Sequence, residues 1–254
     1  MNYPNVIEER VKIGDISAIV FRPTGRQEKL PGVVFYHGWS SNKDSQRFRS
    51  YILSSLGYVV LLPDSIYHGE RGLIDYSKKE NGPMFWEVVL NNLKEWSNIK
   101  DFLISKYKID KDRIAVSGHS MGGFTSAGIF AQDKGIKALI VHNGSCNWRG
   151  SNDIFIKTLG FSENDNFSEL EVNIHGNDPM GKTESLVDRA ILILHGDNDQ
   201  VVSIEPQIEF YNKLIELNNN NDSLKMITYS GLNHYLTTGM LEEMTYWLEK
   251  HLKE

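Results

Sequence analysis

Apolar positions along the chain form short runs of strand length that alternate with longer stretches of helical periodicity. Two alternating runs, residues 6–13 and 16–21, meet at Gly14-Asp15 and predict a hairpin. Further strands are expected at residues 30–36, 58–62, 114–118, 136–141, 190–194 and 224–229. Helices are expected at residues 44–56, 83–107, 124–131, 206–217 and 240–252.

Strands that alternate with helices indicate an α/β fold, with a mostly parallel central sheet covered by helices on both faces. The 254 residues suffice for one such domain, and we expect residues 1–254 to form it. Residues 143–186 lose periodicity and are rich in Asn, Ser, Gly and Asp. A long irregular stretch inside a compact domain is usually functional, so we expect a small lid or cap there.

Composition narrows the possible partners and the compartment. The net charge of −6 and the lack of a dense Lys/Arg run argue against a nucleic-acid or anionic-membrane surface. No apolar run has the length of a membrane span, and residues 1–12 do not resemble a secretory signal. Cys146 is the only cysteine, so no intrachain disulfide can form, and we expect a cytoplasmic protein.

The pattern Gly-x-Ser-x-Gly stands between an expected strand and an expected helix, at Gly118 to Gly122. Small residues on both sides let Ser120 occupy a tight turn from which its hydroxyl projects. The turn would also place the N–H of Met121 at a helix N-terminus, where it can donate to an oxyanion. The plain alternative is a glycine-rich helix start without a catalytic role.

Two later loops, each directly after an expected strand, carry the partners that a serine nucleophile requires. A hydroxyl needs an imidazole to accept its proton and a carboxylate to orient that imidazole. The loop after residues 190–194 contains Asp197 and Asp199, and the loop after residues 224–229 contains His234. A third loop, after residues 30–36, could supply a second oxyanion donor from the N–H of Trp39.

These ordered motifs resemble the α/β-hydrolase superfamily over nearly the whole chain, and most of all small bacterial esterases related to the prolyl oligopeptidase and dienelactone hydrolase groups. In that family the second acid of a His-Gly-x-x-Asp-x-x-Val loop orients the histidine, which implies Asp199 here. Two positions depart from the pattern. Dienelactone hydrolases have a cysteine where this chain has Ser120, and Ser203 replaces a frequent proline.

Other polar residues have simpler interpretations. Arg71 could bind a substrate carboxylate, although an ion pair with Glu70 is the favoured alternative. His37, His119 and His195 are interpreted as structural hydrogen-bonding residues at strand ends. No His-Glu-x-x-His motif, cysteine pair or phosphate-binding loop occurs, so we expect neither a metal nor a cofactor.

The expected reaction is hydrolysis of a small-molecule carboxylic ester by Ser120, Asp199 and His234 through an acyl-enzyme. A thioesterase, amidase or peptidase would use the same triad, and a non-catalytic ligand-binding protein on this fold is a rival from another class. Because the cap is small, we expect short to medium acyl chains. Its apolar residues would form a pocket wall or simply pack onto the domain: Trp148, Phe155, Ile156, Leu159 and Phe161.

Overall fold

The computed structural model describes residues 5–25, 29–159 and 167–253, and eight strands in this part of the chain form one sheet. The strand order is β1-β2-β4-β3-β5-β6-β7-β8. β2 runs antiparallel to both of its neighbours, and all other adjacent strands are parallel. The strands are β1 (Val6–Ile13), β2 (Ile16–Pro23), β3 (Gly32–Tyr36), β4 (Val59–Pro63), β5 (Ile114–His119), β6 (Ala138–His142), β7 (Ala190–Gly196) and β8 (Leu224–Tyr229).

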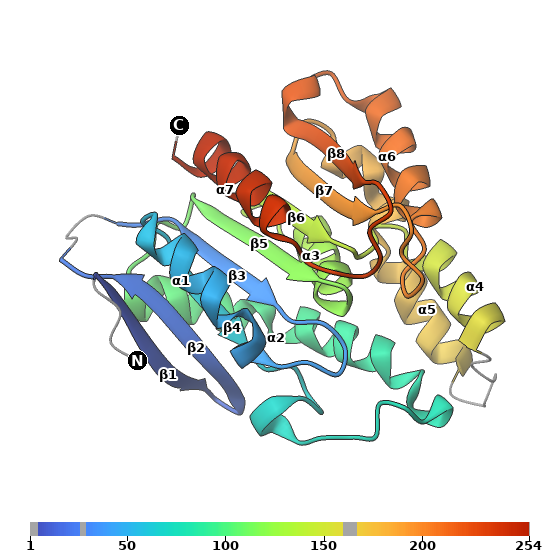
Figure 1. Ribbon diagram of the computed structural model, residues 1–254, viewed down its shortest axis with the longest axis horizontal. Coiled ribbons are helices and arrows are strands. Elements are labelled where there is room, and N and C mark those ends of the chain that lie inside the picture. Colours follow the sequence, from blue (N-terminus) through green and yellow to red (C-terminus); the bar gives the residue numbers. More distant parts are fainter. Residues whose placement is uncertain (1–4, 26–28, 160–166, 254) are drawn as a thin grey trace.

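Helices cover both faces of this sheet, as the alternating pattern predicted. Helices α1 and α7 lie on one face, whereas α2, α3 and α6 lie on the other (Figure 1). The α-helices are α1 (Arg47–Ser55), α2 (Met84–Tyr107), α3 (Met121–Gln132), α4 (Trp148–Leu159), α5 (Phe167–Asn177), α6 (Glu205–Leu217) and α7 (Thr238–Leu252). Short 3₁₀ segments are η1 (Lys43–Gln46), η2 (Gly69–Arg71), η3 (Lys79–Asn81), η4 (Pro179–Leu186) and η5 (Asn221–Ser223).

The hydrophobic core has two layers because successive side chains of a strand point to opposite faces. In β3, Val33 and Phe35 pack on the side of α1 and α7, whereas Val34 and Tyr36 pack on the side of α2 and α3. All four are at most 1% exposed. A strand buried on both faces needs a continuous apolar run, which explains why the central strands were readable from the sequence.

The expected hairpin and the remaining expected strands are confirmed, and residues 84–107 form one continuous helix. Helix α1 buries small polar residues and leaves a large apolar residue exposed. Phe48 is 67% exposed, and α1 instead buries Ser50, Leu53 and Ser54 against the sheet. Small serine side chains allow the helix to approach the strands closely, which a pattern based on apolar residues does not reveal.

The expectation that residues 143–186 are irregular is wrong, because the described part of this segment folds into α4, α5 and η4. Figure 1 shows α4 and α5 beside the carboxyl ends of the parallel strands. The carboxylate of Asp178 accepts the N–H groups of Trp148 and Arg149, each at 3.0 Å, and so caps the start of α4. This cap comes from a distant residue, and it leaves no local signal in the sequence.

Among the helices of the described residues, not one combines the length and the apolar character that crossing a bilayer requires.

Candidate active site

Ser120 occupies the sharp turn between β5 and α3, with φ +56° and ψ −121°. A non-glycine residue holds such a backbone only where its surroundings impose it, and these strained positions concentrate at functional sites. Both flanking glycines are required sterically. A Cβ on Gly118 would lie 2.1 Å from the carbonyl of Gly122, and a Cβ on Gly122 would lie 2.1 Å from the carbonyl oxygen of Tyr36. The turn therefore has the geometry of a nucleophile elbow.

A carboxylate and an imidazole meet across the loops that follow β7 and β8. Nδ1 of His234 lies 2.7 Å from Oδ2 of Asp199. The carboxylate can only accept, so Nδ1 carries the proton and the lone pair of the neutral ring resides on Nε2. The side chain of His234 is 15% exposed and that of Asp199 is fully buried. This arrangement prepares the imidazole to act as a base.

Asp199 is held in place by its own loop. The N–H groups of Val201 and Val202 donate to Oδ1, each at 2.9 Å, and Nε2 of His195 lies 3.3 Å from Oδ2. Burial by itself raises the pKa of the Asp199 carboxyl, but the hydrogen bonds from His195, His234 and Val202 outweigh it and hold the pKa well below its usual value. Asp199 is therefore a carboxylate throughout the physiological pH range.

The imidazole of His234 lies against the ring of His119, the residue that precedes Ser120 in the chain. The rings of His119 and His234 lie 4.9 Å apart between centroids. Burial, together with the nearby His234, lowers the pKa of His119 to about 3, so this ring stays neutral. The expected nucleophile and base thus lie at the same edge of the sheet.

Asn143 connects the two loops, and the sequence did not reveal it. Its side chain donates to the carbonyl of Tyr235 at 2.9 Å and accepts the N–H of Gly196 at 3.1 Å. Asn143 follows β6 with φ +45°, a conformation that asparagine tolerates better than most residues. A polar residue directly after a central strand was the signal that could have identified it.

The two expected oxyanion donors belong to two segments that adjoin Ser120. Met121 is the first residue of α3, and the first N–H groups of a helix have no acceptor within that helix. The loop that carries Trp39 lies against the serine, because a Cβ on Gly38 would be 3.3 Å from the Cβ of Ser120. Both Trp39 and Ser120 also line the same cavity. The backbone at the start of α3 and the backbone of the loop after β3 therefore both lie close to the serine.

This cavity has a volume of about 370 Å³. Its lining consists of Trp39, Tyr76, Ser77, Lys78, Lys79, Gly82, Phe85, Ser120, Phe155, Thr158, Val201 and Val202. A second cavity of about 390 Å³ involves α2 and α5, but Ser120 does not line it. Aromatic side chains next to the serine suit an apolar group on a substrate.

The pocket residues expected from the sequence lie in different places. Phe155 lines the cavity. Trp148 is fully buried against Trp86 at 5.4 Å between ring centroids, and it is not part of the cavity lining, so it packs the core. Arg71 binds Glu95 through two hydrogen bonds of 2.5 and 2.8 Å, so its ion-pair partner is Glu95 and not the expected Glu70. Phe161 lies outside the described residues.

The segment between β4 and α2 forms one wall of the cavity, which the sequence did not reveal. Tyr76, Lys78 and Lys79 from this segment line the cavity together with Phe85 at the start of α2. Long connections after a parallel strand commonly form binding sites. The length of the connection between β4 and α2 was the signal that could have identified this wall.

Two of the three histidines at strand ends, His37 and His195, make the hydrogen bonds expected of them, whereas Nε2 of His119 is buried without a hydrogen-bond partner among the described residues. His37 contacts the carbonyl of Gly38 at 2.8 Å and accepts the N–H of Ser65 at 3.1 Å, while His195 contacts the carbonyl of Val202 at 3.0 Å. Within the described part of the chain, no three His, Cys, Asp or Glu side chains gather as metal ligands do.

Comparison with known proteins places this geometry in a family. The model of the prolyl oligopeptidase family matches residues 44–254. Esterase YjfP of Escherichia coli (strain K12) is 27% identical over 254 residues, which cover 97% of this chain and 99% of YjfP. YitV of Bacillus subtilis (strain 168) is 26% identical over 243 residues, covering 92% of this chain and 94% of YitV.

A solved structure supports the fold independently of close sequence similarity. TT1662 from Thermus thermophilus superposes with a TM-score of 0.79 at 18% identity, covering 96% of this chain and 98% of TT1662. At that identity the likeness concerns the fold alone. Because the family model spans most of the chain and the elbow, loops and sheet agree with it, the chain belongs to the prolyl oligopeptidase family within the α/β-hydrolase superfamily, and it is a hydrolase.

Proposed function

We propose that the protein hydrolyses carboxylic esters with Ser120 as nucleophile, His234 as general base and Asp199 as the residue that orients the imidazole. The observation that carries the proposal is the 2.7 Å contact between Asp199 and His234, at the sheet edge where Ser120 occupies a strained turn. A hydroxyl is a weak nucleophile at neutral pH, and this arrangement supplies the base that activates it.

The first half-reaction forms the acyl-enzyme. Oγ of Ser120 attacks the ester carbonyl while its proton passes to Nε2 of His234. The N–H groups of Met121 and Trp39 stabilise the negative charge that develops on the carbonyl oxygen. The bond to the alcohol oxygen then breaks, and His234 returns the proton to the leaving alkoxide.

The second half-reaction releases the acid. His234 removes a proton from water, and the resulting hydroxide attacks the acyl carbonyl. The bond to Oγ breaks, and the proton on His234 returns to Ser120, which restores the free enzyme.

Two features support the proposed ester substrate. YjfP, which is named an esterase, matches this chain over almost the whole length of both proteins. The aromatic lining of the 370 Å³ cavity also suits a short or medium acyl or alcohol group. Peptide hydrolysis is the second candidate, because the matching family is named for an oligopeptidase. A thioester would also be attacked by the same triad.

A fluorophosphonate probe and a substrate panel test this proposal. The wild-type protein should be labelled at one serine. The Ser120→Ala variant should remain folded and should not be labelled. Its turnover rate should fall by a factor on the order of 10⁴ to 10⁶. Matched ester, thioester and anilide substrates should give the highest kcat/KM for the ester. A folded Ser120→Ala protein with near-wild-type activity would disprove the assignment, and a preference for anilides would establish the peptidase alternative.

A further inference from the structure

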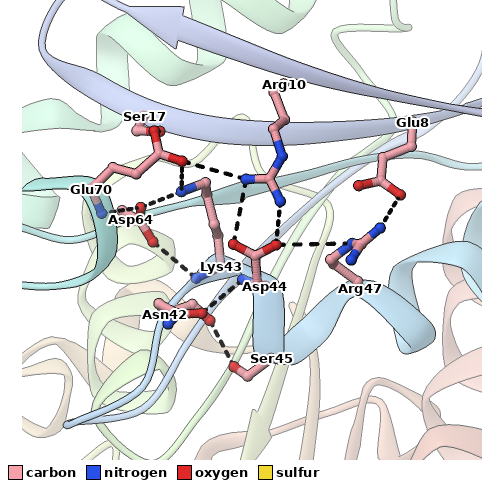
Figure 2. A network of polar contacts seen from close by, with 10 residues as sticks. All are labelled: Glu8, Arg10, Ser17, Asn42, Lys43, Asp44, Ser45, Arg47, Asp64 and Glu70. Atoms are coloured by element: carbon pink, nitrogen blue, oxygen red, sulfur yellow. Dashed lines mark hydrogen bonds and ion pairs between the residues drawn. The ribbon is translucent and has the colours of Figure 1, made fainter. Parts of the chain in front are cut away.

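A buried ion pair lies close to the candidate site without belonging to it. The side chains of Lys43 and Asp64 are 1% and 0% exposed, and Nζ lies 2.5 Å from Oδ2 (Figure 2). Removing two charges from water is costly, and an apolar pair of similar size often stabilises a fold equally well. A contribution to stability therefore does not by itself explain why two charged residues are buried here. The segments that the pair connects suggest another role.

The carboxylate of Asp64 binds the backbones of two loops at once. Asp64 directly follows β4, and its Oδ1 accepts the N–H of Lys43 at 2.9 Å, in the loop after β3. Its Oδ2 accepts the N–H of Glu70 at 3.0 Å, in η2. These bonds fix main-chain positions, which are the positions that an oxyanion donor depends on.

Gly69 shows how closely the chain surrounds this carboxylate. Gly69 has φ +56°, and a Cβ there would lie 2.4 Å from Oδ2 of Asp64. Only glycine permits both the conformation and the close approach. The carboxylate therefore sits in a cage with no room for displacement on that side.

The loop that carries Trp39 is attached to the start of the β4 loop on both sides of Trp39. Before Trp39, the N–H of Ser65 donates to Nε2 of His37 at 3.1 Å. After Trp39, Lys43 binds Asp64 through its backbone and its side chain. Two consecutive residues, Asp64 and Ser65, thus hold the two ends of the Trp39 segment.

The segment between these two attachments is strained. Ser40, the residue after Trp39, has φ +58°, which a non-glycine residue adopts only when neighbouring contacts hold it there. The N–H of Ser41 donates to the carbonyl of Gly38 at 3.2 Å and closes the turn around Trp39. Without the attachment at Lys43, this turn would be free to relax into a commoner conformation.

Outer contacts extend the network to the β1–β2 hairpin, as Figure 2 shows. Nζ of Lys43 also lies 3.1 Å from Oε1 of Glu70, and Ser17 on β2 donates to the other carboxylate oxygen of Glu70 at 2.7 Å. Arg10 on β1 contacts both Glu70 and Asp44. The charged outer side chains of Arg10, Asp44 and Glu70 are 52%, 38% and 54% exposed, so their ion pairs are weak and the buried pair carries the connection.

We propose that Lys43 and Asp64 are positioning residues for the oxyanion, because they hold the N–H of Trp39 at the place where negative charge develops. The inference rests on the proposed serine hydrolase function, in which Trp39 supplies one donor. An oxyanion donor acts mainly in the transition state, so its misplacement lowers kcat and leaves KM nearly unchanged. Loss of one such donor typically lowers kcat by about 10²–10³.

The decisive experiment removes both charges together. Lys43→Met alone leaves the Asp64 carboxylate buried and unpaired, and it should lower Tm strongly. The double variant Lys43→Met/Asp64→Leu should regain most of that Tm, because no uncompensated charge remains. Its kcat for a short p-nitrophenyl ester should stay about 100-fold low, with KM within about threefold, because the bonds to the two loop backbones are lost.

The affinity for a transition-state analogue is a measurement that a purely structural role of the pair would not change. The affinity for a trifluoromethyl ketone should fall in the double variant by the same factor as kcat/KM. Gly69→Ala gives a second route that keeps both charges, because its Cβ displaces the carboxylate of Asp64; it should lower kcat in the same way. Gly69→Ala also keeps the test available where the double variant does not fold.

Lys100→Met is the matched control. It removes the ion pair of Lys100 on α2 with Asp133 directly after α3, whose side chains are 25% and 20% exposed and which, among the described residues, has no bond to either loop of the network. This variant should lower Tm and leave kcat near the wild-type value. Recovery of kcat together with Tm in the double variant, or wild-type kcat in Gly69→Ala, would overturn the positioning role.

The outcome also separates this inference from the function on which it rests. A wild-type protein that is neither labelled by a fluorophosphonate nor active on esters would remove the hydrolase proposal, and the inference with it. An active wild-type enzyme whose double variant keeps full kcat would overturn only the role of Lys43 and Asp64.

Discussion

Oδ2 of Asp199 contacts Nδ1 of His234 at 2.7 Å, whereas Asp197, two residues earlier, uses its Oδ1 to accept the backbone N–H of Gly231 at 2.6 Å. Both acids lie in the loop after β7, and both reach the loop after β8. Their tasks differ, because one binds the imidazole and the other binds the backbone that leads to it. The two aspartates therefore form a matched pair for mutagenesis.

We predict that Asp199→Asn lowers kcat by about 10⁴-fold, because an amide that donates toward Nδ1 favours the wrong tautomer of the imidazole. Asp197→Asn keeps an oxygen that accepts the N–H of Gly231, so its kcat should stay within about threefold of wild type. Steady-state kinetics of both folded variants gives the ranking. The reverse ranking would transfer the orienting role to Asp197.

Protonation of a single group should cause the decrease of kcat/KM at low pH. Burial lowers the pKa of His37 to about 4 and that of His119 to about 3, so both rings remain neutral between pH 5 and 8. Asp199 remains ionised over the same range. The base must be neutral to accept a proton from Ser120, and histidine is the side chain that changes charge in this range.

We therefore predict that kcat/KM falls with a slope of one proton as the pH is lowered, because a protonated imidazole cannot accept the proton of Ser120. The measurement is kcat/KM of a p-nitrophenyl ester between pH 5 and 9, with Tm followed in parallel to exclude unfolding. A slope of two protons would show that a second histidine takes part, and a flat profile down to pH 5 would contradict a histidine base.

Stability should also decrease in acid, for a different reason. Burial lowers the pKa of His142 to about 3, and its ring stacks on Phe35 at 5.7 Å between centroids. In the unfolded chain an imidazole has a pKa near 6.5. Between about pH 3 and 6.5 the unfolded state therefore binds a proton at this residue and the folded state does not. Each such histidine removes up to about 1.4 kcal/mol per pH unit as the pH falls below 6.5.

The corresponding prediction concerns His142→Phe, which removes one of these titrating groups and keeps an aromatic ring beside Phe35. The slope of the unfolding free energy against pH, from urea titrations between pH 6 and 4.5, should decrease by about one proton relative to wild type. An unchanged slope would show that His142 is protonated in the folded protein.

The sheet, and the loops that bring Asp199 and His234 into contact, were predictable because their signals are local. Parallel strands buried on both faces read as apolar runs, and Ser120, Asp199 and His234 each follow such a run within a short motif. The contacts that complete the site were not predictable, because they join distant positions. Arg71 pairs with Glu95, and Lys43 with Asp64, through the fold rather than through sequence spacing.

The segment at residues 143–186 shows the same limit. Its helix α4 starts where Asp178 accepts two of its N–H groups, so the residue that defines the helix start lies far along the chain. The aromatic residues of the segment could not be assigned to pocket or core by periodicity alone. The structure separates them, because Phe155 lines the same cavity as Ser120 whereas Trp148 is buried in the core.

The final prediction uses that separation to test the size of the substrate. Activity on p-nitrophenyl esters should peak at short acyl chains, because the cavity beside Ser120 measures only about 370 Å³. Phe155→Ala enlarges this cavity and should shift the optimum toward longer chains. Trp148→Ala should lower stability by about 3–5 kcal/mol and leave the ranking of chain lengths unchanged, because Trp148 packs on Trp86 away from the cavity. Both variants lose an aromatic ring from the same helix, so they control for each other when Tm and the ranking are measured together.

A shift of the optimum in Trp148→Ala, or no shift in Phe155→Ala, would contradict the assignment of the cavity wall. A wild-type optimum at long acyl chains would contradict the size argument itself.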